Sequence, residues 1–187
     1  KGSYAVDPQK GAVVMTLTTQ GDVPIHYTLD GSEPTAASPR YTGPVEIGKS
    51  ARFRATALRE GGENASYSRE FAFSKSTGRP AVLNTKPNDS YTFEGASLLV
   101  DGYHSRPVFT SGAWLGYLDE PLDVTIDMGG EQSYRSVELE TLAEKGDWIF
   151  PPSSVTVWVS DNGTDFTEVA SVAVPEAKAG DADGLSL

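Results

Sequence analysis

The sequence contains no cysteine, so it excludes disulfide bonds, a thiol nucleophile and a Cys-ligated zinc site. No apolar run approaches the ~18 residues that a membrane-spanning helix needs. The catalytic signatures G-x-S-x-G, H-E-x-x-H, the P-loop and the glycine-rich dinucleotide turn are also missing. No signal peptide opens the chain, which we therefore expect to be a mature protein or an excised fragment. These absences favour a non-catalytic chain without membrane insertion.

Positive charge is scarce in the later part of the chain. Up to Arg79 there are 10 Lys/Arg against 8 Asp/Glu, whereas from Pro80 onward there are 5 against 18, a net charge of −13. A region of this charge repels phosphate backbones and anionic membrane surfaces. The sequence therefore predicts no nucleic-acid partner, and it leaves neutral ligands and cations open.

Apolar and polar residues alternate through most of the 187 residues, with 19 Gly and 12 Pro between the alternating runs. This period of two predicts short strands joined by turns, and no convincing helical period is present. The sequence predicts an all-β fold with two domains, 1–76 and 77–187, joined by a short polar linker at 75–80. The strands expected from this pattern lie at 13–18, 25–29, 52–57, 124–128, 137–140 and 155–160, the last followed by an Asn-Gly hairpin turn.

The chain from Leu98 to Gly129 is the stretch most suited to hold a ligand. The apolar run Leu98–Val100 predicts a strand that ends at an Asp-Gly turn, and the alternating run at 124–128 predicts a second strand. The loop between them is rich in aromatic and hydrogen-bonding side chains. Such a loop can present a ligand site on a rigid β scaffold.

The run IHYTLDGSEP at 25–34, followed by SPRYTGPV at 38–45, resembles the C-terminal accessory domain of chitobiases and β-N-acetylhexosaminidases. The resemblance implies a small immunoglobulin- or fibronectin-like sandwich without catalytic residues of its own. Asp30 and Glu33 could be read as a glycosidase carboxylate pair. We favour a turn role, because both lie at a turn where Asp commonly bonds its own backbone. His26 is expected to face solvent.

A second ordered series of motifs resembles the discoidin, or coagulation factor 5/8 type C, family. It comprises LVDG at 99–102, WLG at 114–116, VTIDMG at 124–129, WIFPP at 148–152 and VTVWVSDNG at 155–163. The resemblance implies a jelly-roll β-sandwich, a ligand site in loops at one end, and often a structural calcium near the Asp-Gly turn. Asp101 is the calcium ligand that it implies, and the alternative that Asp101 only caps its turn stays open.

The chain departs from this family at its end, because Val174 is followed by the small, polar and Gly-rich run PEAKAGDADGLSL. Without closing strands a sheet edge would be left open. A truncation of the chain or a shortened fold would each explain the departure.

Sugars are bound by stacking on an aromatic ring while polar groups bond the hydroxyls. Tyr103, His104, Arg106 and Trp148 offer this chemistry and are the predicted sugar-binding residues. A solvated role for His104 and Arg106 and a core position for Trp148 are the alternatives. Trp114 is expected in the core. Trp158 alternates away from the valines around it, and we expect it either to face outward or to lie at a domain interface.

Together these patterns predict a non-catalytic accessory region of an extracytoplasmic glycoside hydrolase of the β-N-acetylhexosaminidase kind. Its partners would be glycans with galactose or N-acetylhexosamine ends and the catalytic domain of the same parent chain. The alternative is a pair of structural spacer domains that pack on that catalytic domain and bind no sugar. Catalysis by the region itself is the weakest interpretation.

Overall fold

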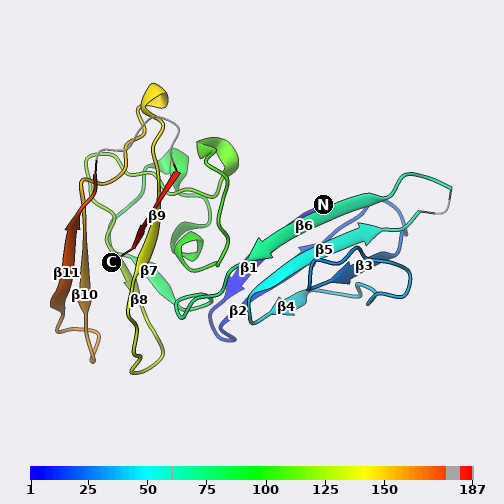
Figure 1. Ribbon diagram of the computed structural model, residues 1–187, viewed down its shortest axis with the longest axis horizontal. Helices are drawn as coiled ribbons and strands as arrows, with labels where there is room; N and C mark the ends of the chain where they lie inside the picture. The colour runs from blue at the N-terminus through cyan, green and yellow to red at the C-terminus, as the bar shows by residue number, and fades with distance from the viewer. Residues whose placement is uncertain (60, 176–181, 187) are drawn as a thin grey trace. The chain divides into compact units, whose positions relative to one another are not determined.

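The computed structural model describes residues 1–59, 61–175 and 182–186, the last of these by their backbone. The described chain is all-β, as predicted, with only short 3-10 helices between its strands. None of the helices in this part of the chain has the length and apolarity needed to cross a membrane. The chain divides into two compact units, which Figure 1 shows with their strands labelled.

Unit 1 comprises residues 1–81 together with the later segment 99–104. Two three-stranded sheets form it, with strand orders β1-β2-β4 and β3-β5-β6, and every neighbouring pair is antiparallel. The strands are β1 (Gly2–Asp7), β2 (Ala12–Leu17), β3 (Ile25–Thr28), β4 (Val45–Ile47), β5 (Ala51–Ala57) and β6 (Ala65–Phe71). The predicted alternation at 13–18, 25–29 and 52–57 therefore falls on β2, β3 and β5.

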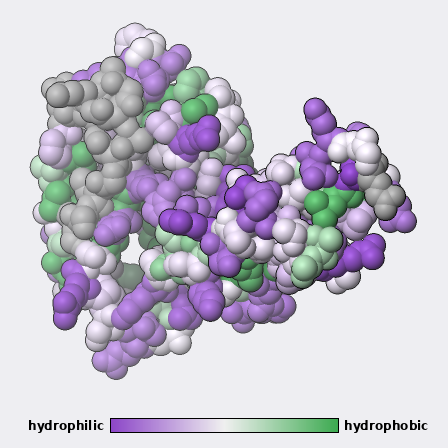
Figure 2. Space-filling view, turned by 45° about the vertical axis from the view of Figure 1, so that its right-hand side comes forward, coloured by the Kyte–Doolittle hydropathy of each residue, from purple (hydrophilic) through white to green (hydrophobic). Residues whose placement is uncertain are grey.

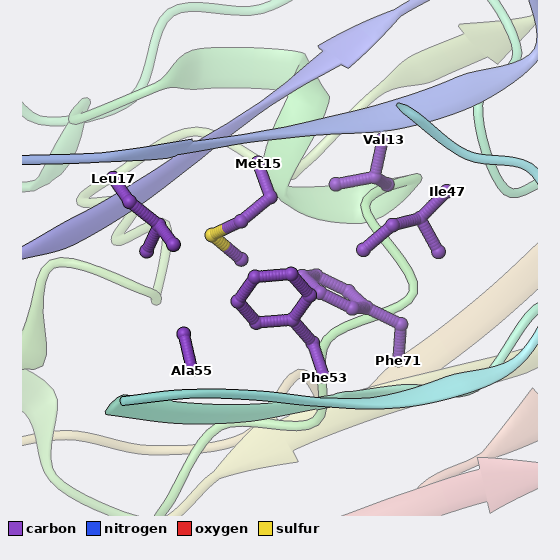
Figure 3. Packing of buried hydrophobic residues seen from close by; sticks show 7 residues of the cluster. All are labelled: Val13, Met15, Leu17, Ile47, Phe53, Ala55 and Phe71. Carbon is purple, nitrogen blue, oxygen red and sulfur yellow. The ribbon is translucent and has the colours of Figure 1, made fainter. Parts of the chain in front are cut away.

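The core of unit 1 lies between its two sheets. Side chains of β2 and β4 point toward those of β5 and β6, and the rings of Phe53 and Phe71 lie at the centre (Figure 3). Both rings are essentially inaccessible to solvent, as are Val13 and Met15. One face of each sheet is thus buried, which is the arrangement that the alternating apolar positions require.

The segment 99–104 completes unit 1, although it follows 17 residues that belong to unit 2. Val100 is 2 % exposed, and its carbonyl accepts a hydrogen bond from the Gly78 N–H at 2.8 Å. The carbonyl of Gly102 accepts one from the Ala72 N–H, also at 2.8 Å. The end of β6 and the chain that follows it are therefore covered by a segment from later in the sequence.

The structure divides the chain differently from the expected boundary at 76/77. The polar run at 75–80, expected to be a linker, is ordered within unit 1, where Thr77 is 6 % exposed and its hydroxyl accepts the Ser74 N–H. Gly78 approaches Gly11 so closely that a Cβ would lie 2.4 Å from the Gly11 carbonyl carbon. This stretch therefore packs as part of the sandwich.

Unit 2 comprises residues 82–98 and 105–187, of which the structure describes those up to 175 and then 182–186. Its strands form three two-stranded sheets, β7-β8, β10-β11 and β12-β9. The strands are β7 (Ala81–Leu83), β8 (Val124–Ile126), β9 (Glu138–Leu142), β10 (Ser154–Val159), β11 (Thr167–Ala173) and β12 (Ala182–Ser186). The 3-10 helices are η1 (Asp89–Tyr91), η2 (Gly95–Leu99), η3 (Phe109–Ser111) and η4 (Lys145–Asp147).

Two expectations for this part of the chain are corrected. The apolar run Leu98–Val100 is not a strand, because its first two residues belong to η2. Val100, which follows, is buried in unit 1. The Gly-rich end contains β12, whose backbone pairs antiparallel with β9 from Ala182 opposite Leu142 to Ser186 opposite Glu138. A strand therefore covers one edge of β9, where the sequence predicted none.

Candidate functional site

The carboxylate of Asp101 caps its own turn. One carboxylate oxygen accepts the Tyr103 N–H at 2.8 Å, and the other accepts the Tyr4 hydroxyl at 2.9 Å. Asp101 is 4 % exposed, and this burial raises the pKa of its carboxyl to about 6, against the opposing effect of the Tyr103 N–H, Tyr4 and Arg69. Burial, followed by the charge of Asp101, also raises the pKa of Tyr4 well above its usual range. The turn-capping interpretation of Asp101 is confirmed.

The ring of Tyr103 is packed against unit 1. The guanidinium carbon of Arg69 lies 4.1 Å from its centroid, and the ring meets Tyr4 edge-on at 5.9 Å between centroids. Arg69 itself lies over Tyr4 at 5.4 Å and donates its Nε–H to the Tyr67 hydroxyl at 3.2 Å. A cation held over an aromatic face in this way is stabilising. One face of Tyr103 is therefore taken by Arg69.

A calcium ion at Asp101 finds little support in this arrangement. Calcium takes six to eight oxygen ligands, commonly from several carboxylates and carbonyls. Both oxygens of Asp101 already accept protein hydrogen bonds. Among the residues that the structure describes, no three His, Asp or Glu side chains are grouped so that they could hold a metal. The donor set does not fit the ion, and calcium here stays a prediction.

The four predicted sugar-binding residues are divided between the two units. Tyr103 and His104 belong to unit 1, whereas Arg106 and Trp148 belong to unit 2. His104 and Arg106 are exposed. The carbonyl of Arg106 accepts the indole N–H of Trp114 at 3.1 Å, so this loop is closed by a half-buried Trp ring. The predicted sugar site at these four residues therefore stays a prediction.

Trp148 stands out from every other aromatic residue in the described chain, because it is 85 % exposed. It follows η4 in a short hairpin whose ends, Glu144 and Ile149, exchange backbone hydrogen bonds of 3.0 and 3.1 Å. The N–H of Trp148 donates to the Lys145 carbonyl at 3.2 Å. In Figure 1 η4, coloured yellow, marks the tip of this loop. The hairpin therefore fixes the backbone beneath an indole ring that faces water.

The backbone of Trp148 adopts a left-handed conformation, with φ +60° and ψ +30°. A bulky residue rarely adopts this conformation, and the strain costs roughly 1–3 kcal/mol. Such strain often marks a functional position. The alternative of a core position for Trp148 is therefore wrong, and Trp114, expected in the core, is only partly buried. Trp158 faces outward, 54 % exposed.

Asp30 and Glu33 both have partners within unit 1. Asp30 accepts the backbone N–H and the hydroxyl of Ser32, at 3.0 and 2.6 Å, and these bonds hold the pKa of Asp30 below its usual range. Glu33 forms an ion pair with Arg54 and accepts the Thr56 hydroxyl at 3.3 Å. The turn interpretation of Asp30 is confirmed.

Unit 1, with two three-stranded antiparallel sheets around one apolar core, defines a small β-sandwich. Residues 3–69 match the chitobiase/β-hexosaminidase C-terminal domain family. The match covers nearly all of β1 to β6 and supports the resemblance seen at 25–45. It ends before the segment 99–104 that completes the unit. No curated protein matches this chain closely enough to count as a relative.

Proposed function

We propose that this chain is a non-catalytic accessory region of an extracytoplasmic glycoside hydrolase and that its second unit binds glycan. The match at residues 3–69 supports an accessory role beside such an enzyme. The finer proposal is that unit 2 is a discoidin-like module and that the parent enzyme is of the β-N-acetylhexosaminidase kind. Binding at the substrate would raise the local concentration of the catalytic domain.

The observation that carries glycan binding is the exposure of Trp148 on a closed hairpin. Trp148 is 85 % exposed, and its backbone has a positive φ, a strained conformation of the kind that often marks a functional position. The flat indole face can stack on the apolar face of a sugar ring, and the fixed backbone reduces the entropy lost on binding. Glu144, Lys145 and Asp147 in the same loop offer polar groups for the sugar hydroxyls.

The other predicted residues take secondary parts in this proposal. Arg106, exposed in unit 2, stays a candidate for polar contact with the glycan. Tyr103 is a weaker candidate, because Arg69 already covers one face of its ring. Glycans with N-acetylhexosamine or galactose ends remain the proposed ligands.

The test is a calorimetric titration of neutral oligosaccharides into the intact chain and into the variant Trp148→Ala. Loss of a stacking ring should weaken binding by about tenfold. Leu118→Ala is the matched control, because Leu118 is also highly exposed in unit 2, at 69 %, and lacks a ring. Equal affinity in the wild type and Trp148→Ala, or no binding of any neutral glycan, would overturn the proposal.

A second candidate function is that of a structural spacer. All the exposed large hydrophobic side chains in the described chain belong to unit 2, except Leu29, which belongs to unit 1. On the face shown in Figure 2, hydrophobic residues interrupt the hydrophilic surface at several places. A spacer would bury such residues against the parent catalytic domain. It would show no glycan binding in the titration above.

A further inference from the structure

The outer face of the β10–β11 hairpin carries an aromatic and hydroxyl surface that is separate from the Trp148 loop. Along β10, Val155, Val157 and Val159 are partly buried, while the alternate positions Ser154, Thr156 and Trp158 are exposed. Opposite them on β11 lie Ala173, Ser171 and Glu168, also exposed. Side chains on opposed strands at these positions share one face of the sheet. Figure 1 shows the two strands side by side.

Trp158 and Glu168 form a directly opposed pair on this face. The register shifts between Val157 and Trp158, so that Val169 is the extra residue of a β-bulge. Without the bulge, Val169 would lie opposite Trp158 in place of Glu168. A bulge re-aims side chains and often lies beside a functional site. Here it sets a carboxylate next to a ring that is 54 % exposed.

A row of hydroxyls continues the face beyond Trp158. Thr156 lies two residues before it on the same strand, about 6.6 Å along the sheet. The hydroxyls of Thr156 and Ser171 hydrogen-bond to each other at 2.9 Å. The face thus combines a flat ring for stacking with hydroxyl and carboxylate groups that hydrogen-bond polyols. This chemistry suits a saccharide.

The charge of the hairpin selects among saccharides. Residues 154–173 include Asp161, Asp165 and Glu168 and contain no Lys, Arg or His. Polyanionic glycans are therefore repelled, as is a second copy of the same hairpin. A tryptophan face is the aromatic surface that attracts an ammonium group most strongly, and a neighbouring carboxylate adds to that attraction.

We propose that the outer face of β10–β11 binds polysaccharide that carries protonated amines, such as a polymer of glucosamine without its acetyl groups. Trp158 stacks on a sugar ring, Glu168 pairs with the ammonium group, and Thr156 and Ser171 bond the hydroxyls. This inference rests on the proposed function as far as glycan binding by unit 2 is concerned. It adds a second surface and a second class of sugar.

The test compares glucosamine oligomers with N-acetylglucosamine oligomers of equal length, titrated calorimetrically into the intact chain near pH 6. We expect the amine-bearing oligomer to bind more tightly. Its affinity should fall when the salt concentration is raised from about 20 mM to about 500 mM, because salt screens exposed charges. Trp158→Ala and Glu168→Gln should each weaken its binding by about three- to tenfold.

Leu118→Ala is the control and should leave binding of the amine-bearing oligomer unchanged, because Leu118 is highly exposed in unit 2 and lies outside the hairpin. Glu168→Gln keeps the size of the side chain, so its effect does not depend on whether Trp158→Ala folds. The proposal would be overturned if neither variant changed the affinity for the amine-bearing oligomer, or if that affinity did not depend on salt. It would also be overturned if polylysine bound with the same affinity as the amine-bearing oligomer and Trp158→Ala did not weaken the binding of polylysine. Binding of the neutral oligomer alone would overturn this inference and leave the proposed function standing.

Discussion

Asp101 and Gly102 show how two adjacent residues attach a later segment to an earlier sandwich. The carboxylate of Asp101 holds the Tyr4 hydroxyl and the Tyr103 N–H, so the strand β1 and the turn share one buried acceptor. Gly102 has a φ of +67°, which a residue with a side chain rarely adopts. Both residues therefore act in the structure of unit 1.

Replacing Gly102 by Ala should destabilise unit 1. A Cβ there would lie 2.9 Å from the Thr77 methyl and 3.0 Å from the Ala72 carbonyl oxygen, in addition to the strain of a positive φ. We expect a loss of about 1–3 kcal/mol in the free energy of unfolding, measured by urea denaturation. Gly11→Ala is the control, because its φ is +61° and its Cβ would meet nothing within 4 Å. Equal losses in the two variants would show that Gly102 is not constrained by its contacts.

The stability of unit 1 should fall as pH rises through the titration of Asp101. Burial raises the pKa of this carboxyl from 3.8 to about 6, so the folded state holds a proton that the unfolded chain releases. The stabilisation is fully present below the unfolded pKa and is lost as pH approaches 6, by up to about 3 kcal/mol. Asp101→Asn should lack this slope when urea unfolding is followed by the amide signals of unit 1. An identical slope in the variant would contradict the assignment.

At the scale of elements, the segment 99–104 belongs with the strands of unit 1. Its backbone bonds to Ala72 and Gly78, and Tyr103 packs against the core cluster. The sandwich formed by β1 to β6 would leave these groups uncovered without it. The family match over residues 3–69 therefore covers most of unit 1 and omits a segment that completes it.

Val100→Ala should destabilise unit 1 and leave unit 2 folded. Removing two methyl groups from a side chain that is 2 % exposed should cost about 2 kcal/mol. All three Trp residues lie in unit 2, so Trp fluorescence reports on that unit while the amide signals of β6 report on unit 1. Val108→Ala, at a side chain that is 47 % exposed, should cost little. A shift of the Trp transition alone would assign Val100 to unit 2.

The strands of unit 1 were predictable because long alternating runs specify a half-buried strand, as in β2 and β5. The short run Leu98–Val100 has no such period, and its conformation depends on the distant parts of unit 1 among which Val100 is buried. β12 has the short sequence ADGLS, which contains no alternating apolar run, and its conformation comes from backbone pairing with β9. The left-handed backbone of Trp148 could not be predicted either, since nothing in the local sequence specifies a positive φ at a Trp.

Across the whole molecule, burial and exposed apolar surface are divided between the units. The deepest side chains, Phe53, Phe71, Met15 and Val13, belong to unit 1. The exposed rings Trp148, Phe150, Trp158 and Phe166 belong to unit 2, in the part of the sequence with a net charge of −13. Both of the proposed glycan-binding surfaces therefore lie in unit 2.

The indole N–H signals of the three Trp residues provide the most direct test of glycan binding by unit 2. They can be assigned with single Trp→Phe variants and followed by NMR while a neutral N-acetylglucosamine oligomer is added. The account predicts a saturable shift of the Trp148 signal and no shift of the Trp114 signal, whose N–H is bonded to the Arg106 carbonyl. A titration in which the Trp148 signal stays in place would contradict it.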